Sequence, residues 1–196
     1  RGLGDVYKRQ AIAFAVETKV EGVTDASEAL THFFFDRLRV MMREAGYSAQ
    51  EVDAVLAKHD TDLAQTPKKL AAVHKFMQLP ESASLAAANK RIANILKKSA
   101  DVQTGEVDDA LLVEEAEKKL YDVLGDHEPI AKLFFEKGEY EGMLATLTPL
   151  KDPVDAFFAD VMVNSEDEKL RLNRLALLKR LYALMNRVAE LSRLAI

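Results

Sequence analysis

The chain has 196 residues, of which 48% are apolar and 30% are charged, and its formal net charge is −5. This length and composition fit one sizeable domain and favour a folded, helix-rich protein over a disordered one. The absence of cysteine excludes disulfides, thiolate catalysis and cysteine metal sites. The negative net charge argues against broad, nonspecific nucleic-acid binding, but it leaves room for a local basic patch.

The first ten residues, RGLGDVYKRQ, resemble a translated sequencing adapter. Because the chain also begins with Arg1 instead of methionine, we expect residues 1–10 to be a non-native leader on a fragment of a longer protein. No apolar run approaches the roughly 18 to 20 residues that cross a bilayer, and no signal-peptide pattern is present. The sequence therefore predicts a soluble protein.

The first helix is expected to begin at a cap formed by Thr24 or Asp25. Apolar residues at helical spacing define one face of it: Leu30, Phe33, Phe34, Leu38 and Met41. Arg37 lies in the middle of this face, which predicts an ion pair inside the bundle, whereas Arg39 points the opposite way, toward solvent. Gly46 is expected to end the helix.

Ser48 and Glu51 have the spacing of a capping box and predict the start of the next helix. His59 and Asp60 follow that helix. Such pairs occur in metal-dependent phosphohydrolases, but the other histidines are scattered, so a histidine at a helix C-terminus is the favoured interpretation. His74 is expected to be a packed core or boundary residue.

The stretch from Leu85 to Ser99 contains no acidic residue and is expected to form a basic helix. Its buried stripe is apolar: Leu85, Ala88, Ile92, Ile95 and Leu96. The exposed face carries polar side chains on two sides, with Lys90, Asn94 and Lys97 on one and Arg91 and Lys98 on the other. Four cations without counter-charge suit phosphate oxygens, and Asn94 could bond sugar or base edges. An ordinary solvated face is the alternative.

Two helices are expected between residues 108 and 136. Asp108 or Asp109 caps the first, which ends at Gly125. The second spans residues 126–136 and points three side chains inward: Ile130, Leu133 and Phe134. A short helix after it has inward positions at Tyr140, Met143, Leu144 and Leu147.

The C-terminal fifth is expected to form a helical hairpin. Asp152 is the predicted N-cap and Pro153 the first helical residue of its shorter arm. Ser165 and Glu168 predict a capping box for a much longer helix that runs to the end of the chain. The buried stripe of this helix consists of Leu170, Leu177, Leu181, Leu184, Val188 and Leu191.

Three polar residues fall on buried stripes and need partners, because an unsatisfied buried polar group costs roughly 1 to 3 kcal/mol. For Asn89 we expect a structural hydrogen bond to a neighbouring loop. Asn173 and Arg174 lie on the C-terminal seam. Arg174 either pairs internally with a carboxylate such as Asp155 or Asp160, or contacts an anionic ligand.

No motif in the sequence predicts catalysis. There is no glycine-rich phosphate loop and no nucleophile elbow, and serines and histidines are not placed together. No strand-like alternation of useful length occurs. The residues by themselves therefore predict an all-α helical bundle with one basic helix and a long C-terminal helix.

The C-terminal hairpin also carries a family resemblance. Its sequence reads FFADVMVN, then a short acidic spacer, then LRLNRLALL. This pattern resembles the end of the beta subunit of bacterial glycyl-tRNA synthetase, the heterotetrameric kind. The likeness extends through AAANKRIANILKKS and FFFDRLRVMMREAGYSAQEVDAVLA, which is nearly everything after about Asp25. It implies a DALR-type anticodon-binding domain over residues 24–196, with residues 11–23 at the junction to the upstream region.

The resemblance implies that this domain binds the anticodon region of glycine tRNA, while adenylation and transfer take place on the alpha subunit. ATP and magnesium are then used by the whole enzyme, with no cofactor or metal in this fragment. The implied partners are glycine tRNA and the alpha subunit, without DNA or a membrane, and the implied location is the cytoplasm.

The candidate tRNA-binding residues are those of the basic helix together with three further arginines: Lys90, Arg91, Asn94, Lys97, Lys98, Arg39, Arg171 and Arg174. None is a candidate for catalysis. Two alternatives stay open. One is a non-catalytic helical domain whose basic helix docks an acidic protein, and the other is the anticodon domain of an arginyl-type synthetase, which shares the architecture.

Overall fold

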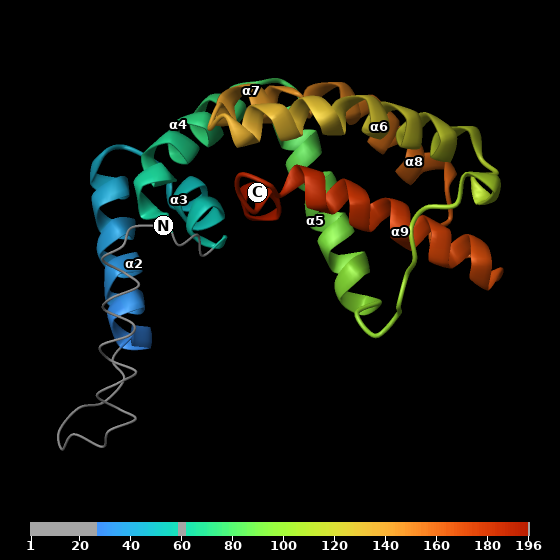
Figure 1. Cartoon of the computed structure of the whole chain (residues 1–196), viewed down its shortest axis with the longest axis horizontal. Coiled ribbons are helices and arrows are strands. Elements are labelled where there is room, and N and C mark those ends of the chain that lie inside the picture. The colour runs from blue at the N-terminus through green and yellow to red at the C-terminus, as the bar shows by residue number, and fades with distance from the viewer. Residues whose placement is uncertain (1–26, 59–61, 196) are drawn as a thin grey trace, which may run out of the picture. The chain divides into compact units, whose positions relative to one another are not determined.

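The computed structural model describes residues 27–58 and 62–195, and every regular element in them is helical (Figure 1). The all-α prediction is confirmed. The α-helices are α2 (Ser27–Glu44), α3 (Ala49–Leu56), α4 (Thr66–Phe76), α5 (Ser82–Lys98), α6 (Glu115–Glu136), α7 (Tyr140–Ala145), α8 (Lys151–Asp160) and α9 (Glu168–Met185). Short 3₁₀ turns accompany them: η1 (Leu63–Gln65), η2 (Asp109–Leu111), η3 (Thr148–Leu150) and η4 (Leu191–Leu194). In the described residues, no helix is long and apolar enough to cross a membrane.

Some expectations concern residues outside the described ranges. They are the leader at 1–10, the junction at 11–23, the cap at Thr24 or Asp25, and the pair His59 and Asp60. The chain divides between Gly46 and Tyr47 into two compact units, and each is described by itself. The extent of one domain over residues 24–196 stays a prediction.

Helix α2 belongs to the first unit and does not bury the face that the sequence analysis assigned to its interior. Phe33, Phe34 and Met41 are 60%, 54% and 54% exposed. Arg37 is exposed as well, so its expected buried ion pair is wrong, whereas Arg39 is half-buried and pairs with Asp36 at 2.9 Å. Periodicity predicts which side of a helix is apolar, but it does not say whether another element covers that side.

The core of the second unit lies where α5 packs against α9 and the turn η4. Leu85 and Ile92 of α5 and Leu177 and Leu181 of α9 are fully buried there, as is Leu191 of η4. Full burial of one such side chain contributes about 1.5 to 3 kcal/mol. Figure 1 shows α5 and α9 crossing, with α6 and α7 beside them on one side. This core holds the basic helix in place.

Helix α6 is a single helix where two were expected, because Gly125 does not end it. The missing N–H of Pro129 removes only the hydrogen bond to the carbonyl of Gly125, four residues earlier. The buried side chains of Leu124 and Ala131 anchor the helix on both sides of that gap.

Two further details of α6 differ from expectation. Asp108 caps the turn η2, and α6 begins later, at a reciprocal box between Glu114 and Glu117. In addition, Ile130 and Leu133 are 46% and 51% exposed, so the predicted inward face of this segment is wrong at both positions. The predicted inward positions in and just after α7 are confirmed, since they are all buried: Tyr140, Met143 and Leu144 in the helix and Leu147 after it.

The C-terminal hairpin exists, but its caps and its end differ from expectation. Helix α8 already begins at Lys151, so Asp152 lies inside its first turn. Asp167 caps α9 by accepting hydrogen bonds from the backbone of Lys169 and Leu170, while Ser165 accepts one from the Asp167 N–H. The predicted capping box of Ser165 and Glu168 is therefore wrong.

Helix α9 ends at Met185 and does not continue to the end of the chain. The following segment folds back, and the backbone N–H of Glu190 donates to the carbonyl of Ala54 in α3 at 2.8 Å. Val188 and Leu191 are still buried, as their position on the apolar stripe predicts. They are buried as part of the folded-back segment, however, and not as part of a longer α9.

Candidate functional site

The basic helix α5 exposes all five polar side chains that the sequence analysis singled out on it: Lys90, Arg91, Asn94, Lys97 and Lys98. The predicted exposed face is therefore confirmed. Within residues 27–58 and 62–195, no salt bridge engages any of its four cations. Lys97 and Lys98 also lie in the last turn, where the helix dipole is negative. The face thus presents positive charge that no carboxylate of the described residues neutralises in a salt bridge.

Two of these side chains reach neighbouring elements. The Lys90 ammonium donates to the carbonyl of Ala195 at 3.5 Å. On the other side, the Arg91 guanidinium lies over the ring of Phe158 in α8, 4.1 Å from its centroid. Stacking on a ring orients the guanidinium and leaves its charge available. The cationic surface therefore extends from α5 toward α8.

Asn89 lies on the buried side of α5 and has a structural role. Its amide nitrogen donates to Oδ1 of Asn186 at 2.7 Å, and the Asn186 amide donates back to Oδ1 of Asn89 at 3.0 Å. Asn186 Oδ1 also accepts from the backbone N–H of Leu191 at 2.8 Å. The expected structural hydrogen bond is confirmed, and its partner stands at the point where α9 ends.

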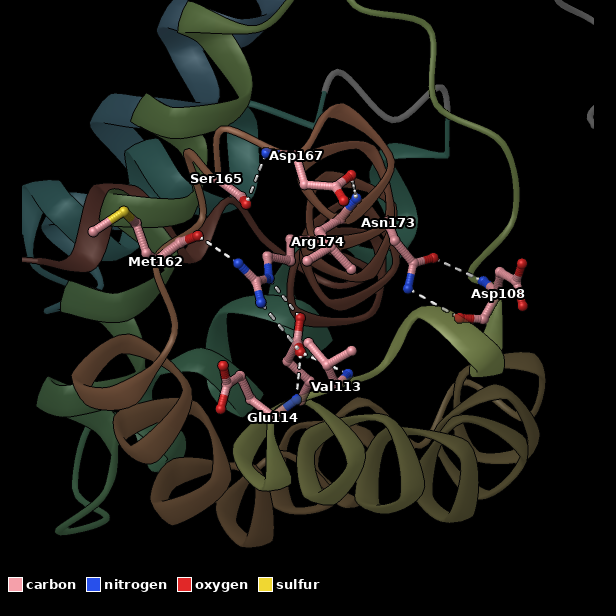
Figure 2. Close-up of polar contacts among 10 residues, drawn as sticks. Asp108, Val113, Glu114, Met162, Ser165, Asp167, Asn173 and Arg174 are labelled. Atoms are coloured by element: carbon pink, nitrogen blue, oxygen red, sulfur yellow. Dashed lines mark hydrogen bonds and ion pairs between the residues drawn. The ribbon is translucent and has the colours of Figure 1, made fainter.

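Arg174 is buried, with its side chain 5% exposed, and its guanidinium is engaged inside the protein. Nε donates to Oε1 of Glu117 at 2.7 Å, and Nη1 donates to the carbonyl of Met162 at 2.8 Å (Figure 2). Of the two alternatives, the structure shows the internal ion pair. The named partners were wrong, since Asp155 instead binds Ser84 and Lys151.

Asn173, next to Arg174, is hydrogen-bonded to the loop that precedes η2. Its side chain accepts from the backbone N–H of Asp108 at 2.8 Å and donates to the carbonyl of the same residue at 3.0 Å (Figure 2). Two consecutive residues of α9 thus fix the loop that follows α5 and the linker between α8 and α9.

The two remaining candidate tRNA-binding residues, Arg171 and Arg39, do not lie on α5. Arg171 is half-buried in the first turn of α9, with Nη2 3.7 Å from Glu168, and its Nε has no hydrogen-bond partner in the described residues. Arg39 lies on α2, in the other unit. No group of acidic, cysteine or histidine side chains in the described part of the chain is arranged to hold a metal ion.

Arg180 was not predicted from the sequence, and the structure places it on α9 with its side chain reaching α6. Its guanidinium donates two hydrogen bonds to Glu128 at 2.9 and 2.8 Å, and the Glu128 carboxylate raises the pKa of Arg180. Only the tertiary structure brings the two residues together, since 52 positions separate them in the chain. No local spacing in the sequence points to this pair.

Comparison with known proteins shows which family this chain belongs to. Residues 85–191 match the family model of the DALR anticodon binding domain. The chain is 55% identical to the glycine–tRNA ligase beta subunit of Leptothrix cholodnii, over 92% of this chain and 25% of that protein. It is 51% identical to the glycine–tRNA ligase beta subunit of Dechloromonas aromatica, over 93% of this chain and 26% of that protein. The chain thus spans about a quarter of the length of the curated relatives it matches.

Proposed function

Because the chain belongs to the family of DALR anticodon-binding domains and is homologous to part of the glycine–tRNA ligase beta subunit, we propose that it binds the anticodon region of glycine tRNA. The observation that carries this proposal is the exposed cationic face of α5, which forms no salt bridge within the described residues and lies at the start of the matched region. Bases of an anticodon loop can be unstacked, and RNA-binding surfaces use cations for the backbone and amides for base edges.

In this proposal the α5 side chains have separate roles. Lys90, Arg91, Lys97 and Lys98 contact phosphates, and Asn94 bonds to sugar or base edges. Arg39 and Arg171 are additional phosphate contacts. Arg174 differs from them, since its burial and its bonds to Glu117 support a positioning role in the folded domain.

The wider assignment follows from the relatives. We propose that the chain acts within a glycine–tRNA ligase, in the cytoplasm, together with an alpha subunit. Adenylation and transfer, with their ATP and magnesium, then belong to parts of the enzyme outside this chain. DNA and membranes are not partners in this proposal.

The test is binding of the chain to glycine tRNA, to an anticodon-substituted glycine tRNA and to an unrelated tRNA across a salt series. The variant Lys90→Ala/Lys97→Ala removes two predicted phosphate contacts. Each lost contact should flatten the slope of log K against log salt by about 0.7 to 0.9. The matched control is Lys68→Ala/Lys119→Ala, which removes two exposed lysines from α4 and α6. It loses the same charge, but its slope should stay near that of the parent chain.

A preference for the correct anticodon that weakens in the α5 variant supports the proposal. Equal or absent binding to all three RNAs contradicts it and favours the protein-interaction alternative, which predicts copurification of a protein without RNA. Tighter binding to arginine tRNA than to glycine tRNA favours the arginyl-type alternative. The identified relatives are glycine–tRNA ligase beta subunits, which supports the glycyl assignment.

A further inference from the structure

Two hollows flank Arg180 on the surface formed by α6 and α9. One has a volume of about 500 Å³ and is lined by Glu128, Lys132 and Arg187 among others. The second, of about 560 Å³, is lined by Tyr121, Lys179 and the loop at residues 104–107. Arg180 lines both. Each volume lies within the roughly 300 to 1,000 Å³ that small-molecule sites occupy.

The planar guanidinium of Arg180, which lines both hollows, is held in one orientation. Its two hydrogen bonds to Glu128 fix it within the plane. The guanidinium carbon lies over the ring of Tyr121, 5.0 Å from the ring centroid. Tyr121 lines only the second hollow, whereas Arg180 lines both, so Arg180 is also reached from the first hollow, on which Tyr121 does not lie. A preoriented plane of this kind suits stacking against another flat group.

The charge around this plane favours an anionic ligand. Lys132 and Arg187 line the first hollow, and Lys179 and Glu106 line the second. Glu128 is already paired with Arg180, and Lys132 lies 3.8 Å from Glu136. Lys179 and Arg187 form no salt bridge within the described residues, so the lining keeps more free cations than free carboxylates. These cations gather on one surface of a chain whose formal net charge is −5. A ligand that fits this site has a flat group, which stacks on the guanidinium, and negative charge beside it, which the cations bind. A nucleotide has both, in its base and its phosphates.

The second hollow is also next to the basic helix. The Lys179 ammonium donates to the carbonyl of Val102 at 3.4 Å, and Val102 lies in the loop directly after α5. The same loop continues to residues 104–107, which line the hollow. This loop therefore connects the end of α5 that carries Lys97 and Lys98 to the second hollow.

We propose that Arg180 and Tyr121 form a stacking platform for one unpaired nucleobase of the RNA loop, with Lys179 and Arg187 beside the flanking phosphates. This inference rests on the proposed function, because it requires that the chain bind an RNA loop. It adds a base-binding site on α6 and α9 to the phosphate-binding face on α5.

The experiment uses the whole chain and the anticodon stem-loop of glycine tRNA, with 2-aminopurine placed at one loop position at a time. The fluorescence of this base analogue reports stacking. For the parent chain, binding should change the fluorescence at one loop position more than at the others. The variant Arg180→Lys keeps the charge but removes the plane, so this change should be lost and the Kd should rise by about tenfold, with the salt slope unchanged.

A second variant, Tyr121→Leu, retains the Arg180 pair with Glu128 and guards against a folding defect in Arg180→Lys. It too should lose the position-specific signal. The control Lys119→Ala lies on the same helix as Tyr121 and is exposed, so its signal should match that of the parent chain. Circular dichroism and thermal melting verify that each variant is folded.

The outcomes separate this inference from the proposed function. If RNA binding depends on Lys90 and Lys97 but no loop position responds to Arg180→Lys or Tyr121→Leu, the platform is refuted and the proposed function stands. If the parent chain binds no stem-loop, both fail. If the hollows instead capture a protein and RNA does not compete, the platform is likewise refuted.

Discussion

Arg174 and Glu117 form an ion pair that is almost completely buried, with 2.7 Å between Nε and Oε1 and with 57 positions between them in the sequence. Glu117 also accepts hydrogen bonds from the backbone N–H groups of Val113 and Glu114, at the start of α6. The Arg174 guanidinium binds the carbonyl of Met162 as well. One pair therefore joins α9, the start of α6 and the linker after α8.

We predict that Arg174→Met destabilises the chain by roughly 3 to 5 kcal/mol, because it leaves the Glu117 carboxylate buried without a counter-charge. Adding Glu117→Gln should restore part of the loss, since it removes the charge while keeping an oxygen that can accept from Val113 and Glu114. The free energy of unfolding in urea measures both effects. The control Arg171→Met breaks a partly exposed pair with Glu168 and should cost at most about 1 kcal/mol. Equal losses for the two single variants would contradict the prediction.

Asn89→Ala should lower the free energy of unfolding by about 1 to 3 kcal/mol. It removes both hydrogen bonds with Asn186 in a fully buried position. For a chain of this size the melting temperature should fall by about 2 to 4 °C per kcal/mol. The same substitution at the exposed Asn94, on the same helix, should change the stability by no more than about 0.5 kcal/mol. A similar melting temperature for the two variants would show that the buried amide pair contributes little.

The stability of the chain should depend on pH through Glu51. Burial acts to raise the pKa of this carboxyl, but hydrogen bonds with the backbone and side chain of Ser48 and with His74 outweigh it, so the pKa lies below its model-peptide value of 4.5. Between the folded-state pKa and about pH 4.5, the unfolded chain then binds more protons than the folded chain. Stability is present above that pH and is lost as the pH falls through the folded-state pKa.

Glu51→Gln should therefore flatten the acid side of the stability profile, as measured by urea unfolding at a series of pH values. His74 takes part in this interaction as a surface residue, with its side chain 49% exposed and Nδ1 2.8 Å from Oε1 of Glu51. Its predicted core or boundary position is thus wrong. A variant profile as steep as that of the parent chain would assign the acid sensitivity to other carboxylates.

Gly138→Ala should destabilise the chain by about 1 kcal/mol, because Gly138 has a φ of +71° after α6, where a side chain is strained. The matched control is Gly105→Ala. Gly105 is not in a left-handed conformation, and a Cβ there meets no atom within 4 Å. Thermal melting of both variants tests the difference. If they melt alike, the backbone at Gly138 tolerates a side chain better than its conformation indicates.

Local spacing in the sequence predicted some features of the fold and of the site correctly. The capping box at Ser48 and Glu51 has both of its hydrogen bonds, at 2.7 and 3.2 Å, because its groups lie three residues apart and one helical turn brings them together. The exposed face of α5 follows from the period of the helix for the same reason. At Ser165, however, spacing was not sufficient, since Asp167 offered a competing oxygen and became the cap.

The sequence by itself determined the helical class, the basic face of α5 and the family resemblance, since composition, helical period and motif are all properties of neighbouring residues. Only the tertiary structure decided that Glu117 is the partner of Arg174, that Asn186 is the partner of Asn89, and that Arg180 lies between two hollows. These pairs join residues that are distant along the chain. The packing of whole helices brings them together, and no local rule specifies which distant carboxylate or amide a buried polar group will meet.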